Sequence, residues 1–128
     1  MPDDWVDVGA MSVVDTLLYI LDDQHAAVPA DDTLTWGRWM QEHKRERKVA
    51  EHISADGWWI STIFTGVEMR IFVCEGGPST PLLFETMAFS PDRHIVEQYR
   101  CATWAQAQVQ HAAVVALVAA RGITLMEV

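Results

Sequence analysis

Five side chains between positions 62 and 111 have the chemistry of a polar binding site: Thr62, Glu85, Thr86, Arg100 and His111. Glu85 is the most unusual of them, because it stands in the middle of "PLLFETMAFS", a stretch whose composition is typical of a buried strand. A buried carboxylate needs a cation or a hydrogen-bond donor beside it. The stretch therefore predicts either an internal ion pair or a ligand site at Glu85.

The alternation of a strand decides which residues accompany Glu85. Leu83, Met87 and Phe89 share its face, while Thr86 points the other way. The short turn "SPDR" returns the chain antiparallel, so Arg100 is the nearest expected cation, and Arg70 on the preceding strand is a second. An ordinary ion pair is the simpler interpretation. In the alternative interpretation, Glu85 lines a pocket and binds a ligand with the other four side chains.

His111 falls in an apolar stripe of the last predicted helix, which consists of Trp104, Ala107, His111, Val115 and Val118. Such a histidine is usually neutral and bonded to one neighbour, here Glu85. A Glu85–His111 pair in a cleft would also suit acid–base catalysis by a small hydrolase or lyase. No catalytic triad order, Gly-rich phosphate loop or metal-ligand spacing accompanies the pair, and the five histidines are scattered. The sequence thus predicts no catalytic residue, no metal site and no cofactor.

The elements that must position these residues indicate an α+β fold. Strand-like composition recurs at 16–21, 48–54, 58–73, 82–89 and 94–101, with a break at Gly66 and a loop over 25–32. Asp31 or Asp32 would cap a short helix, and Thr103 with Gln106 would cap a long one that stops at Gly122. We therefore expect an antiparallel sheet of about five strands, with the long C-terminal helix on one face and a shorter helix near the N-terminus.

The bulk properties indicate one globular domain over residues 1–128, with 1–10 as a flexible extension. The net charge of −9 argues against nucleic acid or an anionic membrane as a partner. The apolar run Ala112–Ala120 is too short to span a bilayer, and no basic segment of a secretory signal opens the chain. Two cysteines without a pairing motif, Cys74 and Cys101, suit a reducing compartment, so a cytoplasmic location is expected.

The last predicted helix also indicates self-association. No charged residue occurs between Cys101 and Ala120, although the solvent side of a surface helix normally carries charge. A two-fold homodimer would bury the uncharged back of the helix, which consists of Val109, Ala113, Ala116, Leu117 and Ala120. Alternatively, the first helix or the N-terminal segment covers that side within one chain.

Four segments, in order, resemble a family of small uncharacterised proteins encoded by bacteriophages and prophages: "LDDQHAAVPADDTLTWGRWMQE", "ISTIFTGVEM", "PLLFETMAF" and "YRCATWAQAQVQH". The family pattern has a Ser-Thr-Val-Phe-x-Gly strand, a Leu-Phe-Glu-Thr-Met strand and a Thr-Trp pair that opens the last helix. The matching residues are Ser61, Thr62, Phe64, Gly66, Leu83, Phe84, Glu85, Thr86, Met87, Thr103, Trp104 and His111. The chain departs from the pattern at Val67, Glu68 and Met69, where the family shows Leu-Asp-His.

The resemblance implies a phage origin and a role inside an infected bacterium, without implying an activity. Together with the absence of catalytic motifs, it leads us to expect a non-enzymatic accessory protein. Such a protein would bind a host factor or a small signalling ligand and would counteract a host defence. A minor structural or assembly protein of the phage is a third possibility, beside the small hydrolase or lyase.

Overall fold

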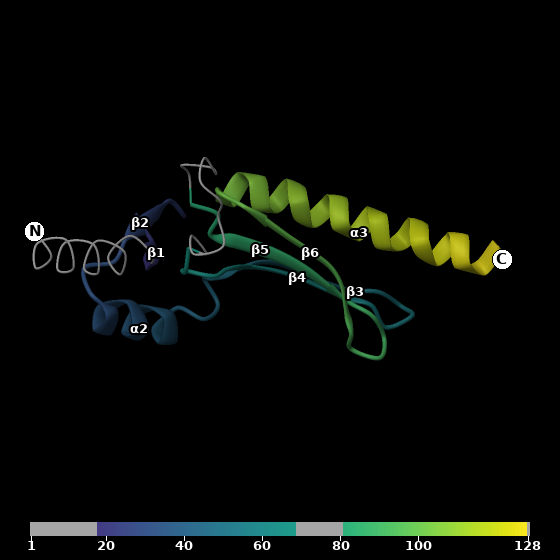
Figure 1. Ribbon diagram of the computed structural model, residues 1–128, viewed down its shortest axis with the longest axis horizontal. Coiled ribbons are helices and arrows are strands. Elements are labelled where there is room, and N and C mark those ends of the chain that lie inside the picture. The colour runs from purple at the N-terminus through teal and green to yellow at the C-terminus, as the bar shows by residue number, and fades with distance from the viewer. Residues whose placement is uncertain (1–17, 69–80, 128) are drawn as a thin grey trace, which may run out of the picture.

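The computed structural model describes residues 18–68 and 81–127, with side chains as far as Ala120. Its elements are β1 (Tyr19–Leu21), β2 (Ala27–Pro29), α2 (Thr33–Glu42), β3 (Lys48–Ile53), β4 (Trp59–Phe64), β5 (Phe84–Phe89), β6 (Ile95–Cys101) and α3 (Trp104–Glu127). The long helix α3 lies along one face of the larger sheet, and α2 lies near β1 and β2 at the other end (Figure 1). The α+β class and the two helices are therefore as predicted.

The number and grouping of the strands differ from the prediction. Four strands form one antiparallel sheet in the order β3-β4-β5-β6, while β1 and β2 form a separate two-stranded sheet. The six strands replace the five expected in one sheet, because β2 lies in the segment predicted as a loop. Three residues are too few to show a periodic pattern, and Pro29 argued against a strand. Pro29 pairs with Tyr19 at the end of this small ladder, where a missing N–H is tolerated.

The local signals for turns and caps are largely confirmed. Gly57 (φ 97°) and Gly66 (φ 72°) both take the left-handed conformation, the first in the turn between β3 and β4 and the second at the predicted break. Asp32 caps α2 by accepting a hydrogen bond from the Thr35 amide at 2.7 Å. Thr103 and Gln106 form the predicted capping box. The backbone N–H of Gln106 donates to the Thr103 hydroxyl at 3.1 Å, and the backbone N–H of Thr103 donates to the Gln106 side-chain oxygen at 3.2 Å.

The predicted end of the last helix is wrong. The backbone of α3 continues through Gly122 as far as Glu127. A glycine inside a helix costs only about 1 kcal/mol relative to alanine. It stops a helix only where the chain turns into the left-handed conformation.

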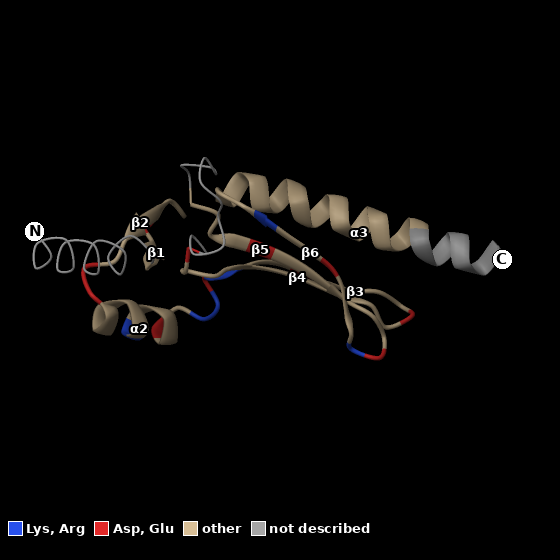
Figure 2. Ribbon diagram, in the orientation of Figure 1, with Lys and Arg blue, Asp and Glu red and all other residues tan. Residues whose placement is uncertain are grey.

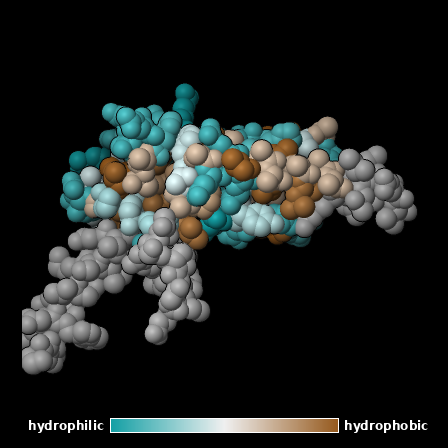
Figure 3. Space-filling view, turned by 90° about the horizontal axis from the view of Figure 1, so that it is seen from above, coloured by the Kyte–Doolittle hydropathy of each residue, from teal (hydrophilic) through white to brown (hydrophobic). Residues whose placement is uncertain are grey.

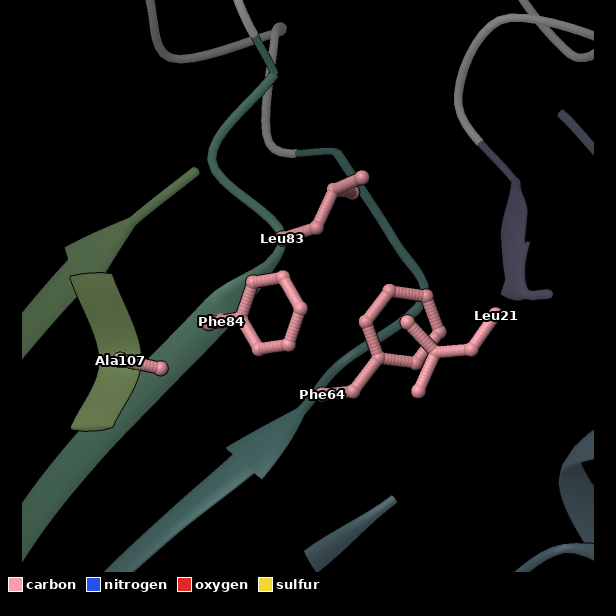
Figure 4. Close-up of a cluster of buried hydrophobic side chains, with 5 residues drawn as sticks. All are labelled: Leu21, Phe64, Leu83, Phe84 and Ala107. Carbon is pink, nitrogen blue, oxygen red and sulfur yellow. The ribbon is translucent and has the colours of Figure 1, made fainter. Parts of the chain in front are cut away.

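Among the described residues, the buried hydrophobic side chains form two clusters on the side of the four-stranded sheet that faces α3. The larger one joins β1, the inner strands and the start of α3 (Figure 4) through Leu21, Phe64, Leu83, Phe84 and Ala107. The smaller cluster, farther along α3, consists of Ile60, Ala88, Val114 and Val118. Both clusters include residues of the sheet face that carries Ile60, Phe64, Phe84 and Ala88. Helix α3 therefore covers that face of the sheet and does not cover the opposite face.

Four sequence-based predictions concern residues outside the described ranges. They are the flexible extension over 1–10, the beginning of the first strand at Thr16, Arg70 as a second cation for Glu85, and the unpaired state of Cys74.

Candidate functional site

Three of the five predicted site residues meet beneath α3. Thr62 on β4 and Thr86 on β5 are direct cross-strand partners, and their hydroxyl oxygens lie 2.8 Å apart. His111 on α3 brings its Nδ1 atom to 2.7 Å from the Thr62 hydroxyl. Neither threonine has any exposed surface. The three side chains therefore form a hydrogen-bonded cluster that ties α3 to the centre of the sheet.

The surroundings of His111 keep its imidazole neutral. Burial lowers the pKa of His111 from its ordinary value of 6.5, and the positive charge of His52 on the neighbouring edge strand lowers it further. The Nδ1 atom of a neutral imidazole can accept a hydrogen bond from the Thr62 hydroxyl, and the Thr86 hydroxyl can then donate a hydrogen bond to the Thr62 oxygen. This arrangement satisfies the two buried hydroxyls and has the properties of a structural link.

The other two predicted site residues form a pair on the opposite face of the sheet. Glu85 stands opposite Arg100 in the ladder between β5 and β6, and the Arg100 Nε atom lies 3.3 Å from the Glu85 carboxylate. Gln98 donates from its side-chain amide to the same carboxylate oxygen at 2.7 Å. Arg100 also donates to the carbonyl of Leu82 at 3.1 Å. Glu85, which is 8 % exposed, is thus paired within the sheet.

The structure does not bring Glu85 and His111 together. Glu85 and Thr86 are adjacent on β5, and adjacent strand residues point to opposite faces. The cluster of His111 lies on the face under α3, whereas the carboxylate lies on the face away from it. The acid–base pair on which the hydrolase or lyase hypothesis depends is therefore not assembled in this geometry.

Two features of the site region were not foreseen from the sequence. Gln98 is a partner of Glu85, and its position two residues before Arg100 on the same strand face was the available signal. His25, in the loop between β1 and β2, stacks on Trp104 with ring centroids 3.8 Å apart. This stack borders a hollow of about 470 Å³ whose lining includes Gln24, Ala27, Leu83 and Thr103. No local pattern connects His25 to Trp104, since they are far apart in the chain.

The face of the sheet that α3 does not cover carries a row of large side chains. Ile53, Trp59, Phe89 and Ile95 occupy matching positions on β3, β4, β5 and β6, and we call these four residues the apolar row. Trp59 stacks on Phe89 with centroids 4.8 Å apart and donates through Nε1 to Glu51 at 2.8 Å. The guanidinium carbon of Arg93 lies 5.8 Å from the centroid of the Trp59 ring. The indole is thus held in place while Ile53 (66 %) and Ile95 (54 %) are exposed.

The predicted interface residues of α3 also lie on the surface of the chain. Val109 is 71 % exposed and Leu117 is 38 % exposed, and Ala113, Ala116 and Ala120 are exposed as well. Figure 2 shows α3 without a charged residue over its described side chains. Ala107, Val114 and Val118 form the buried stripe of the helix, with His111 beside them. Val114 thus takes the position in the stripe at which Val115 was expected, and Val115 is only half-buried.

No protein-family model, no curated protein and no solved structure gives a significant match to the chain. Within residues 18–68 and 81–127, no cluster of three or more His, Cys, Asp or Glu side chains could hold a metal ion. In the same part of the chain, no helix combines the length and the hydropathy that crossing a bilayer requires.

Proposed function

We propose that this protein is a bacteriophage accessory protein that binds a protein of the bacterial host through the uncovered face of its four-stranded sheet. The observation that carries the proposal is the apolar row Ile53, Trp59, Phe89 and Ile95, which spans all four strands on the side away from α3. The phage origin and the host as the source of the partner rest on the sequence resemblance alone.

The composition of the apolar row suits a protein partner. Protein interfaces are enriched in aromatic residues and arginine, and the residues that contribute most to affinity are commonly Trp, Tyr and Arg. Trp59 is oriented by its hydrogen bond to Glu51 and by the Phe89 ring, so little side-chain freedom would be lost on binding. Glu51, Lys48 and Arg93 border the row with both signs of charge, as in the polar rim of an interface.

The hydrogen bonding within the Thr62–Thr86–His111 cluster supports binding over catalysis. A catalytic histidine must reach a substrate, whereas this imidazole is hydrogen-bonded to a threonine that has no exposed surface. The neighbouring carboxylate of Glu85 is occupied by Gln98 and Arg100 on the other face. The hydrogen bonds and the ion pair of these polar residues within the sheet are consistent with a stabilising role on its two faces.

A retention experiment with matched variants tests the proposal. The immobilised protein is incubated with a bacterial host lysate, and retained proteins are quantified by mass spectrometry. Ile53→Lys places a charge in the apolar row, and Leu34→Lys is its control, because Leu34 is 72 % exposed on α2. We expect a protein that the parent and Leu34→Lys retain and that Ile53→Lys loses at least tenfold. If every retained protein is held equally by both variants, the apolar row is not the binding surface.

The hollow beside His25 and Trp104 favours a small ligand as a second candidate function. Polar groups from Gln24, His25 and Thr103 border it together with an indole face, which would suit a small planar molecule. Titration with a panel of nucleotides, followed by tryptophan fluorescence, tests this possibility on the parent and on His25→Ala. A fluorescence change that saturates in the parent and weakens in His25→Ala would support the ligand, and unchanged spectra would exclude the panel.

A further inference from the structure

The two edges of the four-stranded sheet differ in chemistry. On the edge strand β3, Lys48, Glu51 and His52 are exposed, and charged side chains of this kind discourage pairing with another strand. On the opposite edge, β6 exposes Ile95, Val96 and Tyr99. A long edge strand with exposed apolar side chains is a template for a further strand. The edge at β6 is therefore the one that a partner strand would extend.

The backbone of β6 is also suited to a further strand. The side-chain amide of Gln110 on α3 donates to the Arg100 carbonyl at 3.3 Å, which places this carbonyl on the side away from β5. In an antiparallel ladder the outward direction recurs at every second residue, so the backbone N–H and C=O of Gln98 point outward too. The Oε1 atom of Gln110 is buried and has no hydrogen-bond partner. This side of the sheet thus has hydrogen-bonding capacity that the described part of the chain does not use.

The flank of α3 above β6 continues the same surface. A groove between them, of about 600 Å³, is lined by Cys101, Ala105, Gln106, Val109 and Gln110. Ala113 and Leu117 follow Gln110 by three and seven residues, so they lie on the same flank of the helix. Figure 3 looks down on the molecule from the side of α3, and hydrophobic residues gather there toward the C-terminal end. Strand edge and helix flank together form one strip with little charge, which carries Glu97 and Arg100 on β6 and no charged residue on the described flank of α3.

We propose that two copies of the chain pair through β6 about a two-fold axis. The result is a continuous antiparallel sheet with four strands from each copy, and the two α3 helices lie side by side on the same face. The two-fold axis passes beside Gln98 and is perpendicular to the sheet. The outward N–H and C=O groups of Gln98 then lie opposite the same groups of Gln98 in the other copy. In this register Glu97 stands opposite Tyr99 and Arg100 opposite Val96, so no like charges face each other.

A second copy fits this strip better than an unrelated partner does. The chain carries a net charge of −9, so two copies approach each other favourably only through a surface that is poor in acidic groups. A two-fold axis also places β6 beside β6 and α3 beside α3 at the same level of the two copies. An unrelated partner would need both a strand and a helix in the same relative positions to make these contacts. The apolar row lies on the other face of the sheet, so this assembly and the binding of a host protein are independent proposals.

The experiment measures the mass of the full-length protein by size exclusion with light scattering over a dilution series. We expect the parent to have twice the chain mass of 14.4 kDa. Gln98→Pro removes an outward N–H and should weaken the dimer at least tenfold, whereas Gln98→Ala loses the same bond to Glu85 and should remain dimeric. Ala113→Glu should separate the copies, and Ala119→Glu, on the flank of Val115, should not.

Circular dichroism verifies that each variant is folded. If Gln98→Pro is unfolded, the comparison of Ala113→Glu with Ala119→Glu tests the proposal instead. Amide exchange locates the interface: the Gln98 and Arg100 amides should exchange slowly in the parent and at least tenfold faster in Ala113→Glu. A monomeric parent overturns the proposal. It is also overturned by a dimer that Ala113→Glu and Ala119→Glu weaken equally, or by one in which the β6 amides are unprotected.

Discussion

The Nδ1 atom of His111 lies 2.7 Å from the hydroxyl oxygen of Thr62, and this bond connects the middle of α3 to the centre of the sheet. The imidazole takes part in its neutral form, because burial and the charge of His52 lower its pKa. A proton added to this ring therefore acts directly on the contact between helix and sheet.

The first prediction concerns the stability of this contact toward acid. The folded protein binds the His111 proton less readily than the unfolded chain, whose histidine has the ordinary pKa of 6.5. The contribution of neutral His111 to the free energy of unfolding is complete above pH 6.5 and is lost as the pH falls below that value. We expect the melting temperature to fall between about pH 7.5 and pH 5, and to fall less in His111→Gln. His94→Gln, at an exposed turn, is the control, and equal slopes in all three proteins would contradict the prediction.

The second prediction concerns the paired carboxylate on the other face. Glu85→Ala leaves Arg100 and the Gln98 amide without their partner, so unfolding free energy should fall by about 2 to 3 kcal/mol. Glu85→Gln keeps a hydrogen-bonding group and should cost less. Urea titration measures both, with Glu42→Ala as a control at an exposed position of α2. A stable Glu85→Ala would mean that the carboxylate contributes nothing to the fold.

The third prediction compares two glycines. Gly66 has a φ of 72°, and a Cβ atom there would lie 2.9 Å from Trp36 Nε1 and 3.0 Å from Met40 Sδ. The Trp36 indole also donates to the Gly66 carbonyl at 3.0 Å, so it cannot easily move away. Gly66→Ala should therefore destabilise the protein by about 2 kcal/mol or more.

Gly37 is the matched control, because a Cβ atom there meets nothing within 4 Å. It lies inside α2, where alanine is favoured over glycine by about 1 kcal/mol, so Gly37→Ala should stabilise the protein slightly. Thermal melting of both variants provides the test. A neutral Gly66→Ala would mean that α2 can shift away from the sheet at little cost.

The fourth prediction concerns Cys101, which lines the groove between β6 and α3. Burial raises the pKa of its thiol above the ordinary value of 9.0. Since the thiolate is the reactive form, alkylation should be at least about tenfold slower than at an exposed cysteine. Peptide mass spectrometry can compare Cys101 with an added Ala55→Cys in the exposed turn before β4. Equal rates at the two sites would contradict the prediction.

The sequence by itself determined the features that depend on near neighbours in the chain. The caps at Asp32 and Thr103 and the break at Gly66 follow from local backbone chemistry. The ion pair of Glu85 with Arg100 could also be predicted from the sequence, because a short turn brings β6 back beside β5. The short strand β2 and the continuation of α3 beyond Gly122 were missed, since their local signals are weak or point the other way.

Only the tertiary structure decided which face of the sheet receives α3. Alternation places Glu85 and Thr86 on opposite faces, but both faces of β5 are rich in apolar residues, so the pattern does not say which one the helix covers. Packing of Ala107 against Phe64 and Phe84 docks α3 on the threonine side, and His111 is thereby directed to Thr62 instead of Glu85. Docking depends on the fit of surfaces distant in the chain, which a local pattern does not encode.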